Sequence, residues 1–167
     1  MHDFPQEPNT PDAALSPHEA NTAVPPHEAD PGFRRVHVQR VASRHYRAVN
    51  AEGSRVEFGQ GEGLLTPVEL LLAAVAGCSA VDVDVVTSRR SEPEEFTVEA
   101  TGVKGTDETG GSLMKDVELS FRVRFPEDEA GQKAASMVQR LVKLSQEKDC
   151  TVSRTVEHPT PVRMHVE

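Results

Sequence analysis

The sequence predicts an α+β domain preceded by a tail of different composition. Two long segments with apolar residues at helical spacing, 66–88 and 127–148, are separated by segments in which apolar and polar residues alternate. Runs of strands interrupted by a few helices are typical of α+β proteins. The predicted order of elements in residues 34–167 is βββ-α-ββ-α-ββ, with two long central helices and twisted antiparallel sheets.

The predicted tail covers residues 1–33. It holds seven of the twelve prolines, its charged residues are all acidic, and the tetrapeptide PHEA occurs in it twice. Such a segment cannot bury enough apolar surface to offset its loss of conformational entropy, so we predict that it is disordered. His18 and His27 of the two PHEA copies lack the neighbouring ligands that a metal site needs.

Three short strands and a helix are expected first. Valines alternate with polar residues in 36–41, and the segments HYRAVN and SRVEFG flank the turn AEGS. The start of the helix is well marked, because Thr66 suits the N-cap, Pro67 the first helical position and Glu69 a capping box. We expect this helix to end near Ser88.

Two strands, a second helix and two further strands complete the prediction. EFTVEATGV and DVELSFRVRF alternate in polarity on either side of the turn signal TDETGG. The second helix begins at the acids of PEDEAG and ends near Lys148. We expect the last strands at CTVSRTV, residues 150–156, and at PVRMHV, residues 161–166.

Charge and hydropathy argue against nucleic-acid and membrane partners. The formal net charge is -9 and the pI about 5.3, which provides no surface for a phosphate backbone or an anionic lipid. The longest apolar run, 68–81, is short for a membrane span and is followed by Asp82 and Asp84. The first ten residues lack the pattern of a secretory signal, so we expect a cytoplasmic protein.

The first helix also bears on assembly. Residues 70–76 read LLLAAVA and cover every direction around the helix axis with apolar side chains. A helix that is apolar all round has to be buried all round. Because the domain has no tryptophan and one tyrosine with which to enclose it, we expect a homodimer.

The chain has two cysteines, and each is either a packing residue or a reagent. Cys78 lies in the middle of the first helix, where apolar surroundings raise the pKa of a thiol. A reactive Cys78 therefore needs a cation, and a carboxylate such as Glu69 would orient it. Candidate cations in the first strands are Arg34, Arg35, Arg40, Arg44, Arg47 and Arg55.

Helix geometry places Glu69 far from Cys78 and Asp82 close to it. Glu69 and Cys78 are nine residues apart, so they point to opposite sides of the helix and lie roughly 13 Å apart along it. If both belong to one site, Glu69 of one subunit serves Cys78 of the other. Asp82, one turn after Cys78, lies on the side of the thiol, and we expect it to be solvated or paired with an arginine.

Two motifs resemble a known family. TPVELLLAAVAGCSAVDV, residues 66–83, and LSQEKDCTVSRTV, residues 144–156, are similar to the OsmC/Ohr proteins (osmotically inducible protein C and organic hydroperoxide resistance protein), and closer to the OsmC-like branch. The resemblance covers roughly residues 34–166 and implies the OsmC-like fold as an intertwined homodimer, with its two active sites at the subunit interface.

The resemblance also implies an activity and its residues. Cys78 corresponds to the peroxidatic cysteine, Cys150 to the resolving cysteine and Glu69 to the family glutamate. The family arginine falls on Arg44, with Arg47 as the alternate. The implied activity is reduction of an organic hydroperoxide through a sulfenic acid and an intrachain disulfide, which an external dithiol reduces, lipoyl-type in the family, with no cofactor.

Two other classes of function stay open. The first is a dimeric stress or small-molecule-binding protein that is not an enzyme and in which Cys78 is packed and unreactive. The second, weaker hypothesis is a metal protein, for which the sequence offers scattered histidines. These are His37, His45, His158 and His165.

Overall fold

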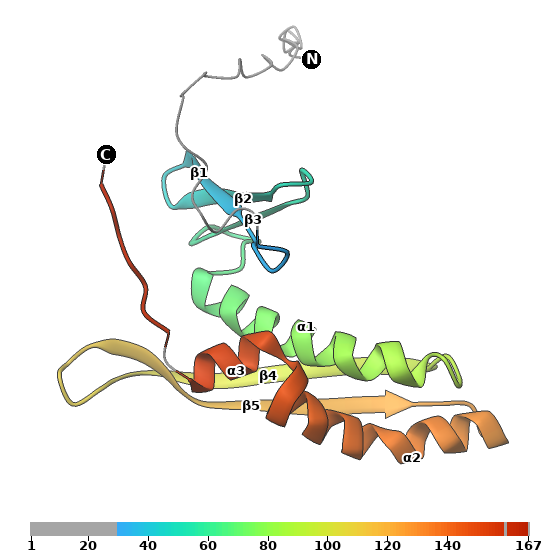
Figure 1. Cartoon of the computed structure of the whole chain (residues 1–167). Helices are drawn as coiled ribbons and strands as arrows, with labels where there is room; N and C mark the ends of the chain where they lie inside the picture. Colours follow the sequence, from blue (N-terminus) through green and yellow to red (C-terminus); the bar gives the residue numbers. More distant parts are fainter. Residues whose placement is uncertain (1–29, 159, 167) are drawn as a thin grey trace, which may run out of the picture. The chain divides into compact units, whose positions relative to one another are not determined.

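The computed structural model describes residues 30–158 and 160–166, and it has the predicted α+β class (Figure 1). The chain divides into two units, Met1–Arg35 and Val36–Glu167. The predicted disorder of residues 1–33 falls mostly on residues 1–29, which lie outside the described part. Within the residues that the structure describes, the elements of secondary structure belong to the second unit.

The predicted three-stranded meander is confirmed. Strands β1 (Val36–Ala42), β2 (His45–Asn50) and β3 (Arg55–Gly59) pair in antiparallel fashion in that order. Arg44 closes the β1–β2 turn with a positive φ of 58°. Gly59 is buried, and a Cβ there would lie 2.0 Å from the carbonyl oxygen of Arg44, so β3 has to pass the turn at a glycine.

Helix α1 (Pro67–Thr87) begins as the sequence predicts. The Thr66 hydroxyl accepts the Glu69 N–H at 3.2 Å, and the Glu69 carboxylate accepts the Thr66 N–H at 2.6 Å, which completes the capping box. The helix packs against α2, α3 and β4. Its buried residues lie four apart on one face, and they are Val75, Ser79, Val83 and Thr87.

We expect Thr66→Ala to lower the free energy of unfolding by about 1 kcal/mol, because the first N–H groups of α1 lose their acceptor. Urea denaturation at a fixed protein concentration measures the change as a lower midpoint with an unchanged slope. Thr66→Ser keeps the hydroxyl and is the matched control. An equal loss in both variants would show that packing of the threonine methyl, and not the cap, is responsible.

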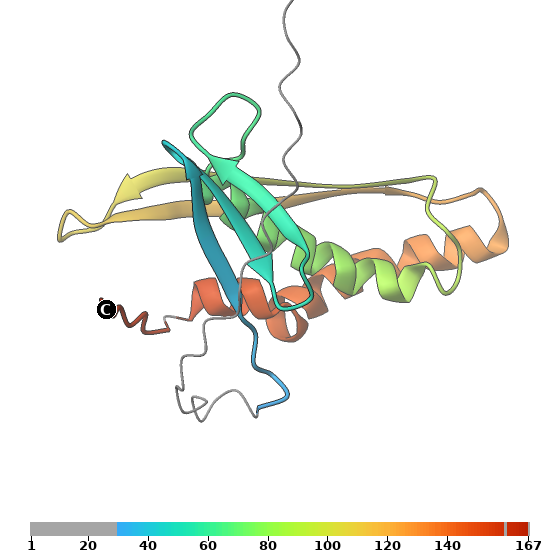
Figure 2. The same cartoon turned by 90° about the horizontal axis from the view of Figure 1, so that it is seen from above.

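A long hairpin and a second helix form the rest of the predicted core. Strands β4 (Glu95–Thr106) and β5 (Ser112–Arg124) are antiparallel neighbours, joined by a turn whose amide groups donate to the Asp107 carboxylate. Helix α2 (Glu129–Leu144) starts at the N-cap Asp128. Helix α1 contacts β4 and α2 contacts β5, so the two helices run side by side along the hairpin (Figures 1 and 2).

The two strands predicted after the second helix are wrong. Helix α2 continues into a π-helical turn, η1 (Ser145–Asp149), and residues 151–157 form helix α3 (Thr151–Glu157). Cys150 caps α3, because its Sγ accepts the Ser153 N–H at 3.3 Å. The β-branched residues of this segment favour a strand, but the cap and packing against α1 override that preference.

Residues 161–166 form no strand in the described chain either. Their apolar side chains find no cover there: Val162 is 78% exposed, Met164 88% and Val166 99%. The same imbalance runs through the molecule, since few large side chains are buried and many apolar ones are exposed. Exposed examples outside the C-terminal segment are Val36, Val38, Val41, Val56, Leu65, Leu71, Val81, Val85 and Val103.

By length and composition alone, α1 is apolar enough to cross a bilayer. That is weak evidence, because the core helix of a soluble protein passes the same test. Here α1 packs against α2, α3 and β4, and Asp82 in its C-terminal half accepts a hydrogen bond from Ser145 of η1. These contacts pack one face of α1 against the rest of the folded unit, while 28% of its most apolar stretch is buried.

Candidate thiol site

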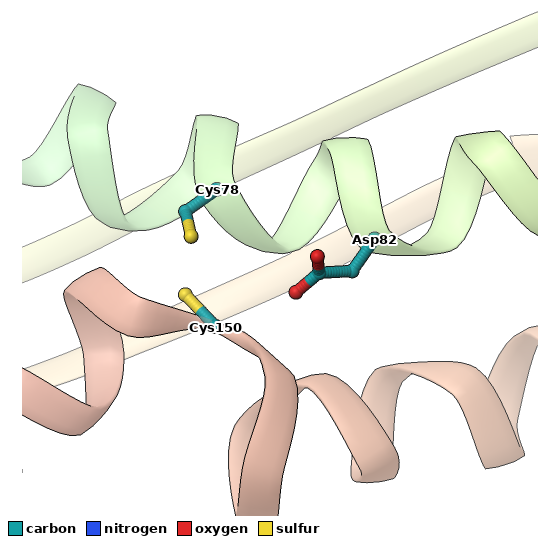
Figure 3. Close-up of side chains that lie close together, drawn as sticks. All are labelled: Cys78, Asp82 and Cys150. Carbon is teal, nitrogen blue, oxygen red and sulfur yellow. The ribbon is translucent and has the colours of Figure 1, made fainter. Parts of the chain in front are cut away.

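The structure brings the two cysteines together. Cys78 lies in the middle of α1 and is half-buried, whereas Cys150 lies between η1 and α3 and is fully buried. Their sulfur atoms face each other, and the Asp82 carboxylate lies beside them (Figure 3). The two sulfur atoms and one carboxylate oxygen of Asp82 all lie within 4.8 Å of one another. The site joins residues that are far apart in the sequence, because α1 passes the junction that follows α2.

Cys150 is surrounded by hydrogen-bonding groups. Its Sγ is hydrogen-bonded to Ser153 Oγ at 3.1 Å and accepts the Ser153 N–H at 3.3 Å, and the Ser79 hydroxyl and the Cys78 thiol also bond to it. Burial by itself raises the pKa of Cys150, but these hydrogen bonds favour the thiolate and outweigh it, so the pKa of Cys150 is lowered. Cys150 is therefore the more acidic thiol of the pair.

Cys78 has the opposite tendency. Burial raises the pKa of Cys78, the charges of Cys150 and Asp82 raise it further, and the N–H of Val152 opposes them by bonding to the sulfur. The expected effect of an apolar helix on Cys78 is thus present.

Asp82 has a different partner from the expected one. It is half-buried, and its carboxylate accepts a hydrogen bond of 2.7 Å from the hydroxyl of the buried Ser145. No arginine pairs with Asp82 in the described chain, and the half-buried carboxylate keeps part of its surface in solvent, as one of the two expectations had it. Ser145 satisfies one oxygen of Asp82 and leaves the carboxylate in contact with the thiols. The spacing of Cys78 and Asp82 marks one helix face in the sequence, but nothing in the sequence points to Ser145.

We expect Asp82→Asn to lower the pKa of Cys78, because a negative charge beside the thiol disappears while burial is unchanged. The pH at which iodoacetamide modifies Cys78 half-maximally then falls, as followed by peptide mass spectrometry. Asp84→Asn, on an exposed part of the same helix, is the control and leaves the pH unchanged. A higher pH in Asp82→Asn would contradict this account.

The other predicted site residues lie elsewhere in the chain. Glu69 is exposed, and its pKa is lowered by the backbone and side-chain hydrogen bonds with Thr66. Arg44 is exposed in the β1–β2 turn, and the sheet that carries it reaches α1 through β3. In the described residues of one chain, neither side chain has a hydrogen bond or an ion pair with the thiols.

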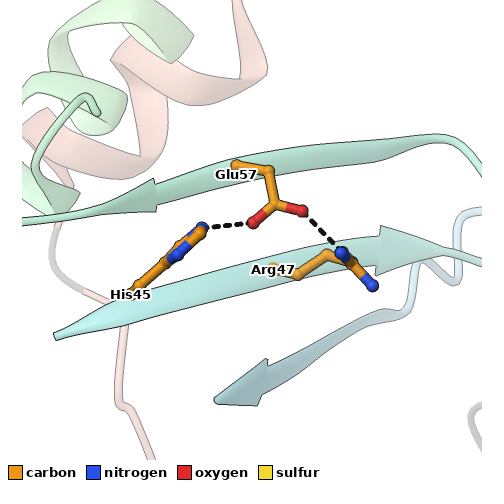
Figure 4. A network of polar contacts seen from close by, with 3 residues as sticks. All are labelled: His45, Arg47 and Glu57. Carbon is orange, nitrogen blue, oxygen red and sulfur yellow. Dashed lines mark hydrogen bonds and ion pairs between the residues drawn. The ribbon is translucent and has the colours of Figure 1, made fainter. Parts of the chain in front are cut away.

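Arg47, the alternate arginine, is already bound to a carboxylate of its own sheet. Its Nε donates to Glu57 at 2.6 Å, and His45 Nε2 lies 2.5 Å from the other oxygen of the same carboxylate (Figure 4). The bond from Arg47 is the main reason why the pKa of Glu57 is lowered. Arg47 is therefore engaged with a carboxylate of its own sheet.

A cavity of about 400 Å³ with a mixed, mostly apolar lining adjoins the thiol site. Ser79 and Ser153, the two serines that hydrogen-bond to Cys150, form part of its wall. Its apolar lining comes from α1, β5, α2 and α3 and includes Val75, Val117, Leu119, Phe121, Val142 and Val156. Its polar lining includes Glu118, Gln146 of η1 and Glu157. The sequence showed no sign of this cavity, because its wall comes from five separate elements.

Fold and site together define an α+β protein with a contacting pair of thiols between a long central helix and a helical junction. The OsmC-like protein family matches residues 59–165, the part of the chain that contains both cysteines. The chain belongs to this family, which confirms the resemblance seen in the sequence.

Similar proteins agree with this assignment. The uncharacterized protein Rv2923c of Mycobacterium tuberculosis is 29% identical over 132 residues, which cover 77% of this chain and 93% of the relative. A solved structure of an OsmC-like protein of unknown function from Vibrio cholerae has a TM-score of 0.62 at 18% identity, covering 75% and 94% of the two chains. A hypothetical protein from Aquifex aeolicus has a TM-score of 0.58 at 24% identity, covering 75% and 87%. These solved structures support the fold.

Proposed function

We propose that the protein is a thiol-dependent peroxidase that reduces organic hydroperoxides through Cys78 and Cys150. The observation that carries the proposal is the contact between a half-exposed thiol and a fully buried one of lower pKa. A peroxide reaches Cys78 more easily than Cys150. The buried Cys150 lies close enough to attack the sulfenic acid that forms at Cys78. Membership of the OsmC-like family supports a role in stress or peroxide defence.

In the proposed reaction Cys78 attacks as a thiolate, after it has lost its proton. Its sulfur attacks the distal peroxide oxygen, the O–O bond breaks, and the leaving alkoxide takes up the proton that Cys78 released to become an alcohol. Cys78 is then a sulfenic acid. The Cys150 thiolate attacks its sulfur, hydroxide leaves, and an intrachain disulfide forms. An external dithiol, lipoyl-type by analogy with the family, returns two electrons and two protons.

The surroundings favour an organic rather than a fully polar peroxide. The cavity next to Ser79 and Ser153 has a mostly apolar lining, with Glu118, Gln146 and Glu157 among its polar residues, and room for a small organic group. Hydrogen peroxide would gain nothing from that lining, whereas an alkyl hydroperoxide buries its chain there. This supports organic hydroperoxides as the substrate class.

The proposal includes a homodimer that completes the site. The all-round apolar helix α1 leaves Leu71, Val81 and Val85 exposed in a single chain, and a second subunit would cover such a surface. In the proposed dimer, Arg44 and Glu69 of one subunit lie beside Cys78 of the other. Arg44 then supplies the positive charge that Cys78 lacks in a single chain, and Glu69 orients it. We place the protein in the cytoplasm, where dithiol reductants regenerate the pair.

The test is consumption of cumene hydroperoxide with a dithiol reductant, measured for the wild type and for Cys78→Ser. We expect turnover by the wild type and only background loss of peroxide with the variant, which lacks the attacking sulfur. Hydrogen peroxide serves as the comparison substrate and should react more slowly. Equal rates for the two proteins would contradict the peroxidase proposal.

One observation favours a second candidate, a non-enzymatic dimeric binding protein: the pKa of Cys78 is raised in a single chain, mainly by burial. A thiol in that state reacts slowly, and the apolar cavity would then hold a small molecule. Alkylation of Cys78 across pH distinguishes the candidates. A half-maximal rate well below pH about 8.5 in the assembled protein supports the enzyme, and a sluggish thiol supports the binding protein.

A further inference from the structure

We propose that the reduced thiol pair and Asp82 form a binding site for a zinc ion. The proposal uses the cysteines of the proposed function but does not depend on a peroxide as substrate. It differs from the expectation, drawn from the sequence, that the protein needs no metal. It also differs from the weaker metal hypothesis, because none of the scattered histidines takes part in the site.

The geometry supplies three ligands close to the required positions. The two sulfur atoms and an Asp82 oxygen lie within 4.8 Å of one another. A tetrahedral zinc ion with Zn–S distances of about 2.3 Å holds two sulfurs roughly 3.8 Å apart. The ligands therefore have to move together by about 1 Å at most, which small rotations of three side chains provide. Solvent supplies the fourth ligand.

The three ligands come from two structural elements, helix α1 and the junction between η1 and α3. Cys78 and Asp82 are four residues apart on α1, so they project from the same face one turn apart. A helix presents pairs of zinc ligands at this spacing in other metal sites. Cys150 approaches from the opposite side, fixed between η1 and α3. A metal between these elements would link the central helix to the end of the second helical segment.

Hydrogen bonds already orient each ligand from behind, as in established zinc sites. Ser145 donates to Asp82 at 2.7 Å and leaves further lone pairs of the carboxylate for a metal. Ser153 and Ser79 bond to Cys150, and the Val152 N–H bonds to Cys78. These groups are in place in the chain as it stands, so a metal would meet ligands that are already aimed.

The donor set selects the kind of metal. Two thiolates favour zinc and other soft ions over magnesium or calcium, which prefer oxygen ligands. Two thiolates and a carboxylate carry three negative charges, and one Zn²⁺ reduces this to a single negative charge. The metal would also occupy both sulfurs at once. Zinc binding and disulfide formation therefore exclude each other.

The experiment is titration of Zn²⁺ into the reduced full-length protein in competition with a chromophoric zinc indicator, without peroxide. We expect one Zn²⁺ per chain for the wild type and no such binding by the disulfide form, Cys78→Ser or Cys150→Ser. Asp82→Asn keeps its shape and its contact with Ser145, and it should weaken binding by about tenfold or more. Asp84→Asn, exposed on the same helix, is the control and should bind like the wild type.

Three results would overturn the proposal. Reduced wild type that takes no zinc from the indicator would remove the site, and equal affinity in Asp82→Asn would remove Asp82 from it. Binding that persists when both cysteines are serine would place the metal elsewhere. Co²⁺ provides a second measure, since its thiolate charge-transfer absorption should fall when either cysteine is replaced. Circular dichroism of each variant separates loss of a ligand from loss of the fold. The peroxidase assay on metal-free protein tests the proposed function independently of zinc binding.

Discussion

Cys150→Ser is expected to change the product of peroxide treatment completely. With about one equivalent of cumene hydroperoxide, the wild type should lose two hydrogens per chain as Cys78 and Cys150 form an intrachain disulfide. In the variant, the sulfenic acid at Cys78 has no neighbouring thiol to intercept it. It should therefore persist at one equivalent and become a sulfinic acid when a second equivalent of peroxide supplies the further oxygen. Intact-mass spectrometry followed by peptide mapping measures both products.

Cys78→Ser is the matched control for this experiment. It keeps Cys150, which is fully buried, so the variant should stay unoxidised at the same dose. The comparison separates a general sensitivity of thiols from a reaction that starts at Cys78. Disulfides between subunits, or over-oxidation of Cys78 at the same rate in wild type and Cys150→Ser, would exclude Cys150 as the resolving residue.

Local signals explain why most of the fold could be predicted. The capping box of Thr66 and Glu69 and the apolar run behind it depend on residues within a few positions, and α1 begins as expected. The alternation in 116–125 likewise identified β5. The prediction for the segment after Cys150 was wrong because its β-branched residues favour a strand. Only the cap at Cys150 and the packing against α1 make it helical.

The site could be predicted only in part, for a related reason. Resemblance to a family pointed to Cys78 and Cys150, and the structure brings them into contact. The sequence does not show that Ser145 bonds to Asp82, because 63 residues separate them and the contact depends on how η1 meets α1. The lowered pKa of Cys150 depends in the same way on Ser79 of another helix. The roles of Arg44 and Glu69 stay predictions, since they depend on a second subunit.

The Gly131→Ala substitution is expected to have the largest effect on stability. Gly131 is buried in the first turn of α2, and its N–H donates to the N-cap Asp128 at 2.7 Å. A Cβ at this position would lie 2.0 Å from the carbonyl oxygen of Pro126. That atom belongs to the backbone, so the chain reversal between β5 and α2 has to move. We expect a loss of about 3 kcal/mol, even though alanine is the better helix former.

Urea denaturation at fixed protein concentration measures this loss, and Gln132→Ala is the matched control. Gln132 is exposed in the same turn of α2, so its replacement should change stability by no more than about 0.5 kcal/mol. A shift of α2 would also move η1 and Cys150 at its far end, because α2 continues directly into that turn. The yield of intrachain disulfide in Gly131→Ala should therefore fall together with its stability. If Gly131→Ala is as stable as Gln132→Ala, the Pro126 carbonyl can move aside with no loss in the free energy of unfolding. This close contact would then not fix α2 in place.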